Sequence, residues 1–120
     1  MSFAVLQEVK NQSVTLWDSD TLARAVVPRE VLKDAAGIPG DVDLDNEKLL
    51  LLASANVAVL GRVASRKLEA GELMPSEPGG RCVLVTAGDI RGAGEKLSAS
   101  VVYAPGFAWG LEIKASRPQT

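Results

Sequence analysis

The stretch Leu49-Leu50-Leu51-Leu52-Ala53-Ser54-Ala55-Asn56-Val57-Ala58-Val59-Leu60-Gly61 is the most apolar part of this 120-residue chain. It contains no charged residue, and Lys48 and Arg62 flank it. A transmembrane helix needs about 20 apolar residues, so this stretch is too short to cross a bilayer. Its side chains have to be buried inside the protein, and we expect the hydrophobic core to form around them.

Two secondary structures are compatible with this stretch. Leu and Ala are good helix formers, so a helix over Leu49–Ala55 is one alternative. No capping residue is apparent at its start, however, and the apolar run continues into Val57–Leu60. We therefore predict two strands, about Lys48–Ala53 and Val57–Ala64, with a bend between them. Periodicity alone does not separate the two alternatives in a short apolar run.

The rest of the chain has the pattern of short strands. Phe3–Trp17 has the pattern of a hairpin with a polar turn at Lys10–Ser13. Further predicted strands are Leu22–Val27, Asp41–Asp45, Arg81–Ala87, Leu97–Tyr103 and Trp109–Ala115. One short helix is expected at about residues 29–36, since Pro28 suits a first turn and Gly37 suits the position after the last. We therefore predict a single mainly β domain over residues 1–120, a small barrel or sandwich of seven or more short strands with one short helix.

Composition argues against several classes of function. The chain has no histidine, which is the usual general base near neutral pH and the commonest zinc ligand. Nucleophile pairs of the Ser-His or Cys-His type are therefore excluded. The 13 Lys and Arg residues are balanced by 15 Asp and Glu, without a block of like charge, which disfavours nucleic acids and anionic membranes as partners. We expect a protein that is not an enzyme and needs no cofactor.

Targeting and redox signals are few. Met1–Val5 contains no basic segment followed by a long apolar one, so we expect no secretion signal and a location in the cytoplasm or in a virion. The single cysteine, Cys82, excludes an intramolecular disulfide. Because Cys82 begins an apolar strand and no histidine can activate it, we interpret it as a small hydrophobic residue.

An acidic alternation resembles half of a metal-binding loop. Asp41, Asp43 and Asp45 have the spacing of the first calcium ligands of an EF-hand. The sixth position, where that loop needs glycine, is Asn46, and the twelfth, where it needs glutamate, is Leu52. A half-buried strand with an acidic outer face explains the alternation better, and we predict no metal site.

The segment Gly88–Leu97 invites comparison with a phosphate-binding loop. A P-loop places lysine and then serine or threonine after its last glycine. Here Glu95 comes before Lys96, and Leu97 stands where a hydroxyl is needed. We therefore predict a flexible hairpin loop. The densest basic group, formed by Arg62, Arg66 and Lys67, is followed by two glutamates and is interpreted as a solvated face.

Three aromatic residues near the C-terminus are candidate interface residues. Tyr103, Phe107 and Trp109 cluster around Pro105-Gly106. Exposed aromatic side chains commonly anchor protein–protein contacts. The same residues are equally compatible with a lid over the core, and both alternatives stay open.

Residues 24–41, from Arg24-Ala25-Val26-Val27-Pro28 to Gly37-Ile38-Pro39-Gly40-Asp41, resemble the swapped-hairpin module of AbrB-type transcription factors. The shared pattern is a strand ending in proline, a short helix, a Gly-Ile pair, and Gly-Asp before a strand. This resemblance implies a following strand from Asp43 to Leu52 and a DNA-binding dimer. The family has basic residues around its first strand, whereas residues 1–52 of this chain hold five Lys or Arg against nine Asp or Glu.

Leu68-Glu69-Ala70-Gly71-Glu72-Leu73, and the strand Val83-Leu84-Val85 followed by Gly88-Asp89-Ile90, resemble the small β-rich decoration proteins of phage heads. That resemblance implies a virion protein without catalytic groups. Together with the composition, it leads to our leading hypothesis of a structural or assembly protein that contacts copies of itself or other structural proteins, in a homo-oligomer or a larger shell. The alternative is an AbrB-like regulator that binds DNA.

Overall fold

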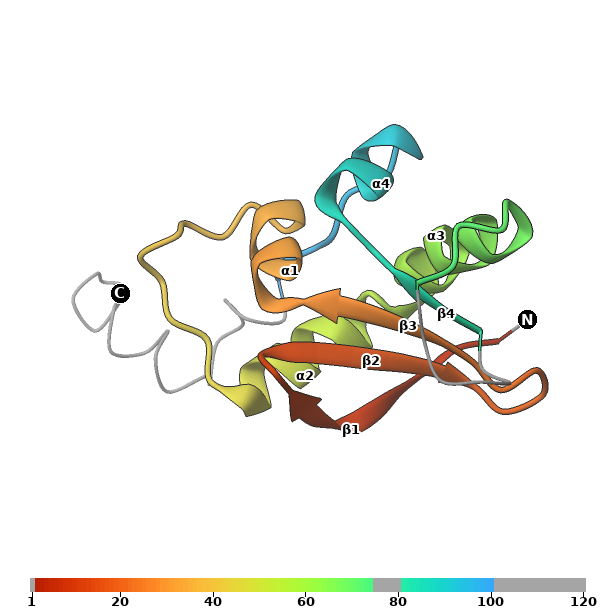
Figure 1. Cartoon of the computed structure of the whole chain (residues 1–120). Coiled ribbons are helices and arrows are strands. Elements are labelled where there is room, and N and C mark those ends of the chain that lie inside the picture. The colour runs from red at the N-terminus through yellow and green to blue at the C-terminus, as the bar shows by residue number, and fades with distance from the viewer. Residues whose placement is uncertain (1, 75–80, 101–120) are drawn as a thin grey trace.

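The computed structural model describes residues 2–74 and 81–100. These residues form one four-stranded sheet, in the order β1-β2-β3-β4, and four helices (Figure 1). The elements are β1 (Ala4–Lys10), β2 (Ser13–Asp18), β3 (Ala23–Pro28), α1 (Arg29–Ala35), α2 (Asn46–Ala55), α3 (Val57–Glu69), β4 (Arg81–Leu84) and α4 (Ala87–Gly92). The predicted mainly β barrel or sandwich of seven or more strands with one helix is therefore wrong, because this part of the chain is a mixed α and β structure.

The N-terminal strands follow the sequence prediction. β1 and β2 form the predicted antiparallel hairpin, and β3 is the predicted third strand, paired antiparallel to β2. The first turn places Asn11 and Gln12 at φ of 51° and 57°. Left-handed backbone at both central residues is typical of a two-residue turn whose twist matches that of the flanking strands. Asparagine tolerates this conformation better than most residues, which explains the turn locally.

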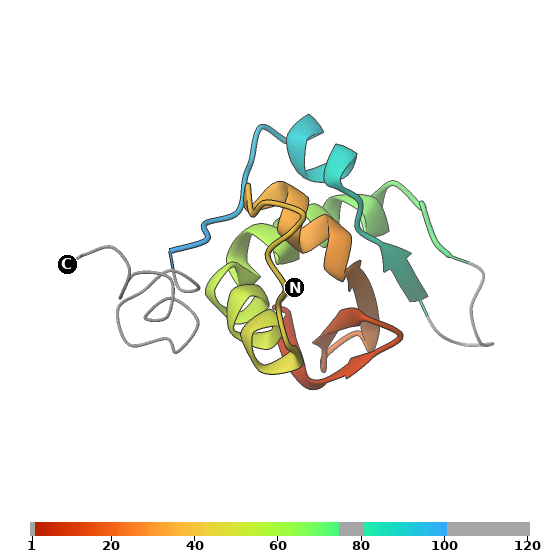
Figure 2. The ribbon, with the colours of Figure 1, turned by 90° about the vertical axis from the view of Figure 1, so that its left-hand side faces the viewer.

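β4 joins the sheet on the other side of β3 and runs parallel to it. Parallel neighbours need a crossover connection, because the chain has to return to the end from which it started. α1, α2 and α3 form that crossover, and the helices lie on one side of the strands (Figure 2). The crossover thus covers one face of the sheet.

The central apolar stretch is helical, so the two predicted strands, Lys48–Ala53 and Val57–Ala64, are wrong. A cap exists at Asp45, whose side chain accepts a hydrogen bond from the backbone N–H of Lys48 at 2.9 Å. This cap satisfies a backbone donor at the start of α2. The strand predicted over Asp41–Asp45 is also absent, and so is the AbrB-like strand from Asp43 to Leu52, because α2 begins at Asn46.

Spacing of the buried residues explains why helices form here. In α2 the buried apolar residues are Leu49, Leu52 and Ala53, and in α3 they are Leu60, Val63, Ala64 and Leu68. Steps of three and four residues place these side chains on one face of a helix. The four consecutive leucines hide this pattern, since Leu51 is 38% exposed on the other side of α2.

Asn56 marks the break between α2 and α3. Its buried side-chain amide donates to the backbone oxygens of Leu52, at 2.8 Å, and of Ser98, at 2.9 Å. The side-chain oxygen accepts from the backbone N–H of Ser98 at 2.8 Å. One amide side chain therefore joins the end of α2 to the segment that follows α4.

The predicted short helix is confirmed as α1, and Gly37 after it has a φ of 72°, as the C-terminal position of a helix requires. The strand predicted over Arg81–Ala87 is confirmed only to Leu84. The flexible loop predicted over Gly88–Leu97 is wrong in its first part, which is α4. Leu97–Ser100 is not a strand, and the remainder of that predicted strand and the one over Trp109–Ala115 lie outside the described residues.

Candidate functional site

The sheet has two faces of different character. Side chains that point toward the helices are sealed, and Val14, Leu16, Ala25, Val27 and Val83 are all 0% exposed. They belong to one core cluster that includes Leu32 of α1, Leu52 of α2 and Leu60 of α3. We call this side the inner face.

The opposite side of the sheet is defined by the alternate residues of the same strands. Cross-strand pairing sets Thr15 beside Val26 and Val26 beside Leu84, and it sets Trp17 beside Arg24 and Arg24 beside Cys82. Paired residues point to the same side of a sheet. We call these six residues the outer face.

The outer face is apolar at its centre and incompletely covered. Trp17, Val26 and Leu84 are partly buried, and Arg24 is exposed. None of the three apolar residues belongs to the core cluster or to the half-buried residues that pack against it in the described part of the chain. The helices lie on the other side of the strands (Figures 1 and 2). The outer face is therefore an apolar surface separate from the core.

Cys82 lies on the outer face and not in the core. Its thiol lies 3.7 Å from the sulfur of Met74, and its backbone oxygen accepts from the N–H of Met74 at 2.7 Å. Met74 therefore runs beside the edge of β4. The prediction that Cys82 lies in an apolar strand is confirmed, since it is the second residue of β4.

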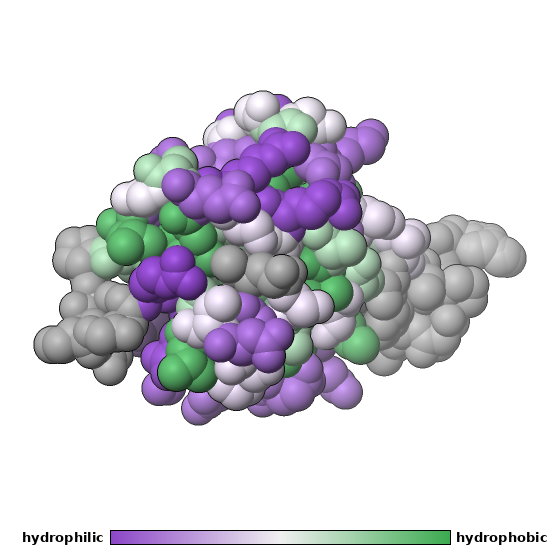
Figure 3. All heavy atoms as spheres, turned by 90° about the vertical axis from the view of Figure 1, so that its right-hand side faces the viewer, coloured by the Kyte–Doolittle hydropathy of each residue, from purple (hydrophilic) through white to green (hydrophobic). Residues whose placement is uncertain are grey.

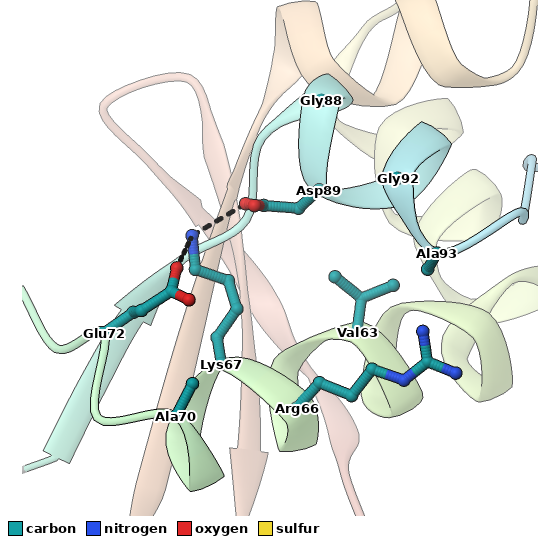
Figure 4. A pocket seen from close by; sticks show the side chains of 9 residues that line it. All are labelled: Val63, Arg66, Lys67, Ala70, Glu72, Gly88, Asp89, Gly92 and Ala93. Atoms are coloured by element: carbon teal, nitrogen blue, oxygen red, sulfur yellow. Dashed lines mark hydrogen bonds and ion pairs between the residues drawn. The ribbon is translucent and has the colours of Figure 1, made fainter.

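Apart from the two faces of the sheet, the structure has a cleft between the C-terminal half of α3 and α4 (Figure 4). This cleft has a volume of about 340 Å³ and is lined by Val63, Arg66, Lys67, Ala70, Glu72, Gly88, Asp89, Gly92 and Ala93. The ammonium group of Lys67 lies 2.7 Å from Oδ2 of Asp89 and 3.7 Å from Oε1 of Glu72. Lys67 and Asp89 are 14% and 24% exposed at their side chains, so the shorter ion pair is largely shielded from water.

Asp89 is held by two further hydrogen bonds. Its carboxylate accepts from the backbone N–H of Thr86 at 2.9 Å, while the Thr86 hydroxyl accepts from the N–H of Asp89 at 3.1 Å. This reciprocal pair is a capping box at the start of α4. Burial raises the pKa of Asp89, but the hydrogen bonds from Lys67 and Thr86 outweigh it, and the pKa lies below its ordinary value.

The charged residues that line the cleft hold α3 against α4. A carboxylate that is stabilised in its charged form is a poor proton donor near neutral pH. Figure 3 views the right-hand side of Figure 1 and shows hydrophilic side chains gathered over the upper part of that view, where α3 and α4 lie. Arg62 adds a two-pronged ion pair to Glu95, at 2.8 and 3.2 Å, which lowers the pKa of Glu95. These contacts connect α3 to α4 and to the segment after it.

The acidic residues that resemble a calcium loop do not converge. The Asp45 side chain caps α2, and Asp43 is exposed and lies 3.9 Å from a guanidinium nitrogen of Arg29. In residues 2–74 and 81–100 there is no group of three or more Cys, Asp or Glu side chains that could hold a metal ion.

The remaining candidate residues are the three aromatic residues near the C-terminus and the basic residues of α3. Tyr103, Phe107 and Trp109 lie outside the described residues, so their role as an interface stays a prediction. Lys67 and Arg62, which we interpreted as part of a solvated basic face, make ion pairs that hold α3 to the elements beside it. Sequence reasoning missed the outer face, although Ser13–Asp18 alternates and has apolar or β-branched residues on both sides.

Comparisons of the chain with models of protein families, with curated proteins and with solved structures return no match. In the described part of the chain, no single helix is long and apolar enough to span a membrane; only α2 and α3 together have the length and composition, as a pair bent by 75°.

Proposed function

We propose that this protein is a non-enzymatic structural or assembly protein that acts through protein–protein contacts, in a homo-oligomer or a larger shell such as a phage head. The observation that supports this proposal is the outer face, an apolar sheet surface that the helices leave uncovered. Apolar patches on a folded domain commonly mark the surfaces that bind other proteins. In this proposal the protein works in the cytoplasm or in a virion.

The charges of the described residues also favour this function over DNA binding. Arg29, Arg62, Lys67 and Arg91 all lie within 4 Å of a carboxylate. Phosphate binding depends on clustered cations that are available to the ligand. Salt-dependent gel retardation tests the DNA-binding alternative, and a steep loss of DNA affinity with salt would replace our proposal.

The experiment that tests the proposal measures the size of the assembly in the native source. We compare the tagged chain with its Thr15→Lys variant, which adds a charge to the centre of the outer face, and with Ser54→Lys, which adds the same charge at an exposed position of α2. The unchanged chain and Ser54→Lys should elute in a complex larger than one chain, and Thr15→Lys should elute as a single chain. Elution of the unchanged protein as a single chain would overturn the proposal.

A further inference from the structure

The outer face has an apolar centre that is suited to contact with another protein surface. Its apolar centre consists of Trp17, Val26 and Leu84, with Thr15 beside them. Sheets whose two faces are both partly apolar are usually covered on both sides, either by helices or by a second sheet. Among the described residues, the helices occupy only one side (Figure 2). A sheet with helices on one face and apolar residues on the other has the layer order of one half of a β-sandwich.

Charge on and around the outer face decides between classes of occupant. Arg24 is the exposed cation on it, and at its β1 edge the strand carries Glu8 and Lys10, which are also exposed. Because two cations and one carboxylate lie on and beside this face, the carboxylate of one copy can meet a cation of the other. A nucleic acid or an anionic membrane would need clustered cations instead, and the whole chain has a formal net charge of −2.

We propose that the outer face binds the outer face of a second copy of this chain, so that two sheets stack between two layers of helices. This inference rests on the proposed function and names its partner. Stacked sheets lie about 10 Å apart with their strands aligned to within about 30°. The pairing covers Trp17, Val26 and Leu84 of both copies and leaves the helical layers on the outside.

The size of the surface predicts how tight the pair is. Four strands about 4.8 Å apart, with about five residues each at about 3.3 Å per residue, give a projected area of roughly 300 Å². With side-chain relief included, two copies bury on the order of 1,000 Å² of accessible surface in total, which is at the low end for specific interfaces. Interfaces of this size are typical of weak or transient pairs, so we expect a dissociation constant of about 10⁻⁶ to 10⁻⁴ M.

Cys82 supplies a direct readout of this contact. It is the only cysteine of the chain and lies on the outer face. Stacking covers its surroundings, so its reaction with a small alkylating reagent slows as the protein concentration rises through the dissociation constant. We expect sedimentation equilibrium over the same concentrations, about 1 µM to 1 mM, to show conversion from monomer to dimer.

Two lysine variants test whether the dimer forms through the outer face or through another surface. Thr15→Lys should remain monomeric, with Cys82 reacting at one rate throughout, whereas Ser54→Lys should behave as the unchanged chain does. Circular dichroism checks that Thr15→Lys is folded. If Thr15→Lys does not fold, Val26→Thr is the substitute test. It replaces one methyl group by a hydroxyl at nearly the same shape, and it should weaken the dimer about tenfold.

Two results would overturn the inference: a monomer at every concentration, or a dimer that neither variant of the outer face weakens. The first result leaves the proposed function intact if the native complex is still lost in Thr15→Lys, because the partner is then a different protein. The proposed function fails separately, when the unchanged chain elutes as a single chain from its native source.

Discussion

The two faces of the sheet are built from alternate residues of the same strands, yet they differ in how they are covered. Leu16 and Ala25 of the inner face are 0% exposed, whereas Thr15 and Val26, their neighbours in the chain, are only partly buried. The inner face is sealed by three helices of the crossover, whereas no helix among residues 2–74 and 81–100 covers the outer face. The same strands therefore contribute one set of side chains to the core, and the alternate set forms the surface that we propose as a contact site.

Leu16→Ala should produce the largest loss of stability, and it tests most directly whether the inner face contributes more to stability than the outer face. Leu16 is fully buried in the core cluster, so truncation removes apolar contacts and leaves a cavity. We expect the free energy of unfolding to fall by about 3 kcal/mol. Thr15→Ala, one residue earlier, should cost less than about 1 kcal/mol. Urea denaturation of dilute protein measures both, and equal losses would contradict the distinction between the faces.

Asn56→Ala tests how the helical layer is fastened over the inner face. It removes three hydrogen bonds, one of them buried, and leaves backbone groups of Leu52 and Ser98 without their side-chain partner. We expect a loss of about 2 kcal/mol in the free energy of unfolding. Asn46→Ala, at the exposed first residue of α2, is the matched control; it loses only an exposed hydrogen bond from Arg29, at 3.3 Å, and should cost less than about 0.5 kcal/mol. If the two variants unfold at the same urea concentration, Asn56 does not fasten the layer.

Asp89→Asn tests the contribution of the ion pair between α3 and α4. Because the pKa of Asp89 is lowered in the folded protein, its charge stabilises the fold at pH values above its ordinary pKa of 3.8. That contribution is lost as the pH falls through the lower pKa of the folded state. We expect the variant to lose about 1 kcal/mol at pH 7 and to depend less steeply on pH below about 4.

Urea denaturation at a series of pH values measures this effect. The pKa values of Asp18, Asp45 and Glu95 are lowered as well, so the unchanged chain and the variant should both lose stability in acid. The control is Asp34→Asn, whose ion pair with Arg91 is exposed on both sides. Curves of identical slope for the unchanged chain and Asp89→Asn would refute a stabilising charge at this position.

Thr15→Lys should have the smallest effect on the stability of the isolated chain, and it tests the outer face directly. Its side chain is partly exposed, so a lysine can reach water, and we expect the free energy of unfolding at low protein concentration to change by less than about 1 kcal/mol. At high concentration the unchanged chain gains stability from association, and the variant should not. A stability of the unchanged chain that does not depend on concentration would contradict this expectation.

Local patterns predicted the first third of the fold. The hairpin from β1 to β2, the strand β3 and the short helix α1 each carry their own signals, namely residues that favour strands, a polar turn at Lys10–Ser13, and Pro28 with Gly37 at the helix ends. Nearest-neighbour chemistry determines these elements, so a short window of sequence is sufficient to find them.

The central stretch failed as a prediction because its periodicity is masked. Leu50 and Leu51 are as apolar as the buried Leu49 and Leu52, so composition does not show which leucines face the core. The N-terminal cap at Asp45 is a signal that the sequence did contain, and we read it as part of an acidic strand. Of the candidate site, the sequence predicted that Cys82 lies in a strand but not which face of the sheet it occupies.

Sequence patterns were sufficient to show that the apolar stretch contributes to the core, that the chain has no histidine, and where the antiparallel strands and the first helix form. The path of the whole chain was needed to show that the stretch forms two helices, that β4 pairs with β3 across more than fifty residues, and that the described helices cover only one face of the sheet. The physical reason is that burial of apolar side chains has no direction, whereas the crossover between parallel strands does. Which face is covered depends on the path of the whole chain.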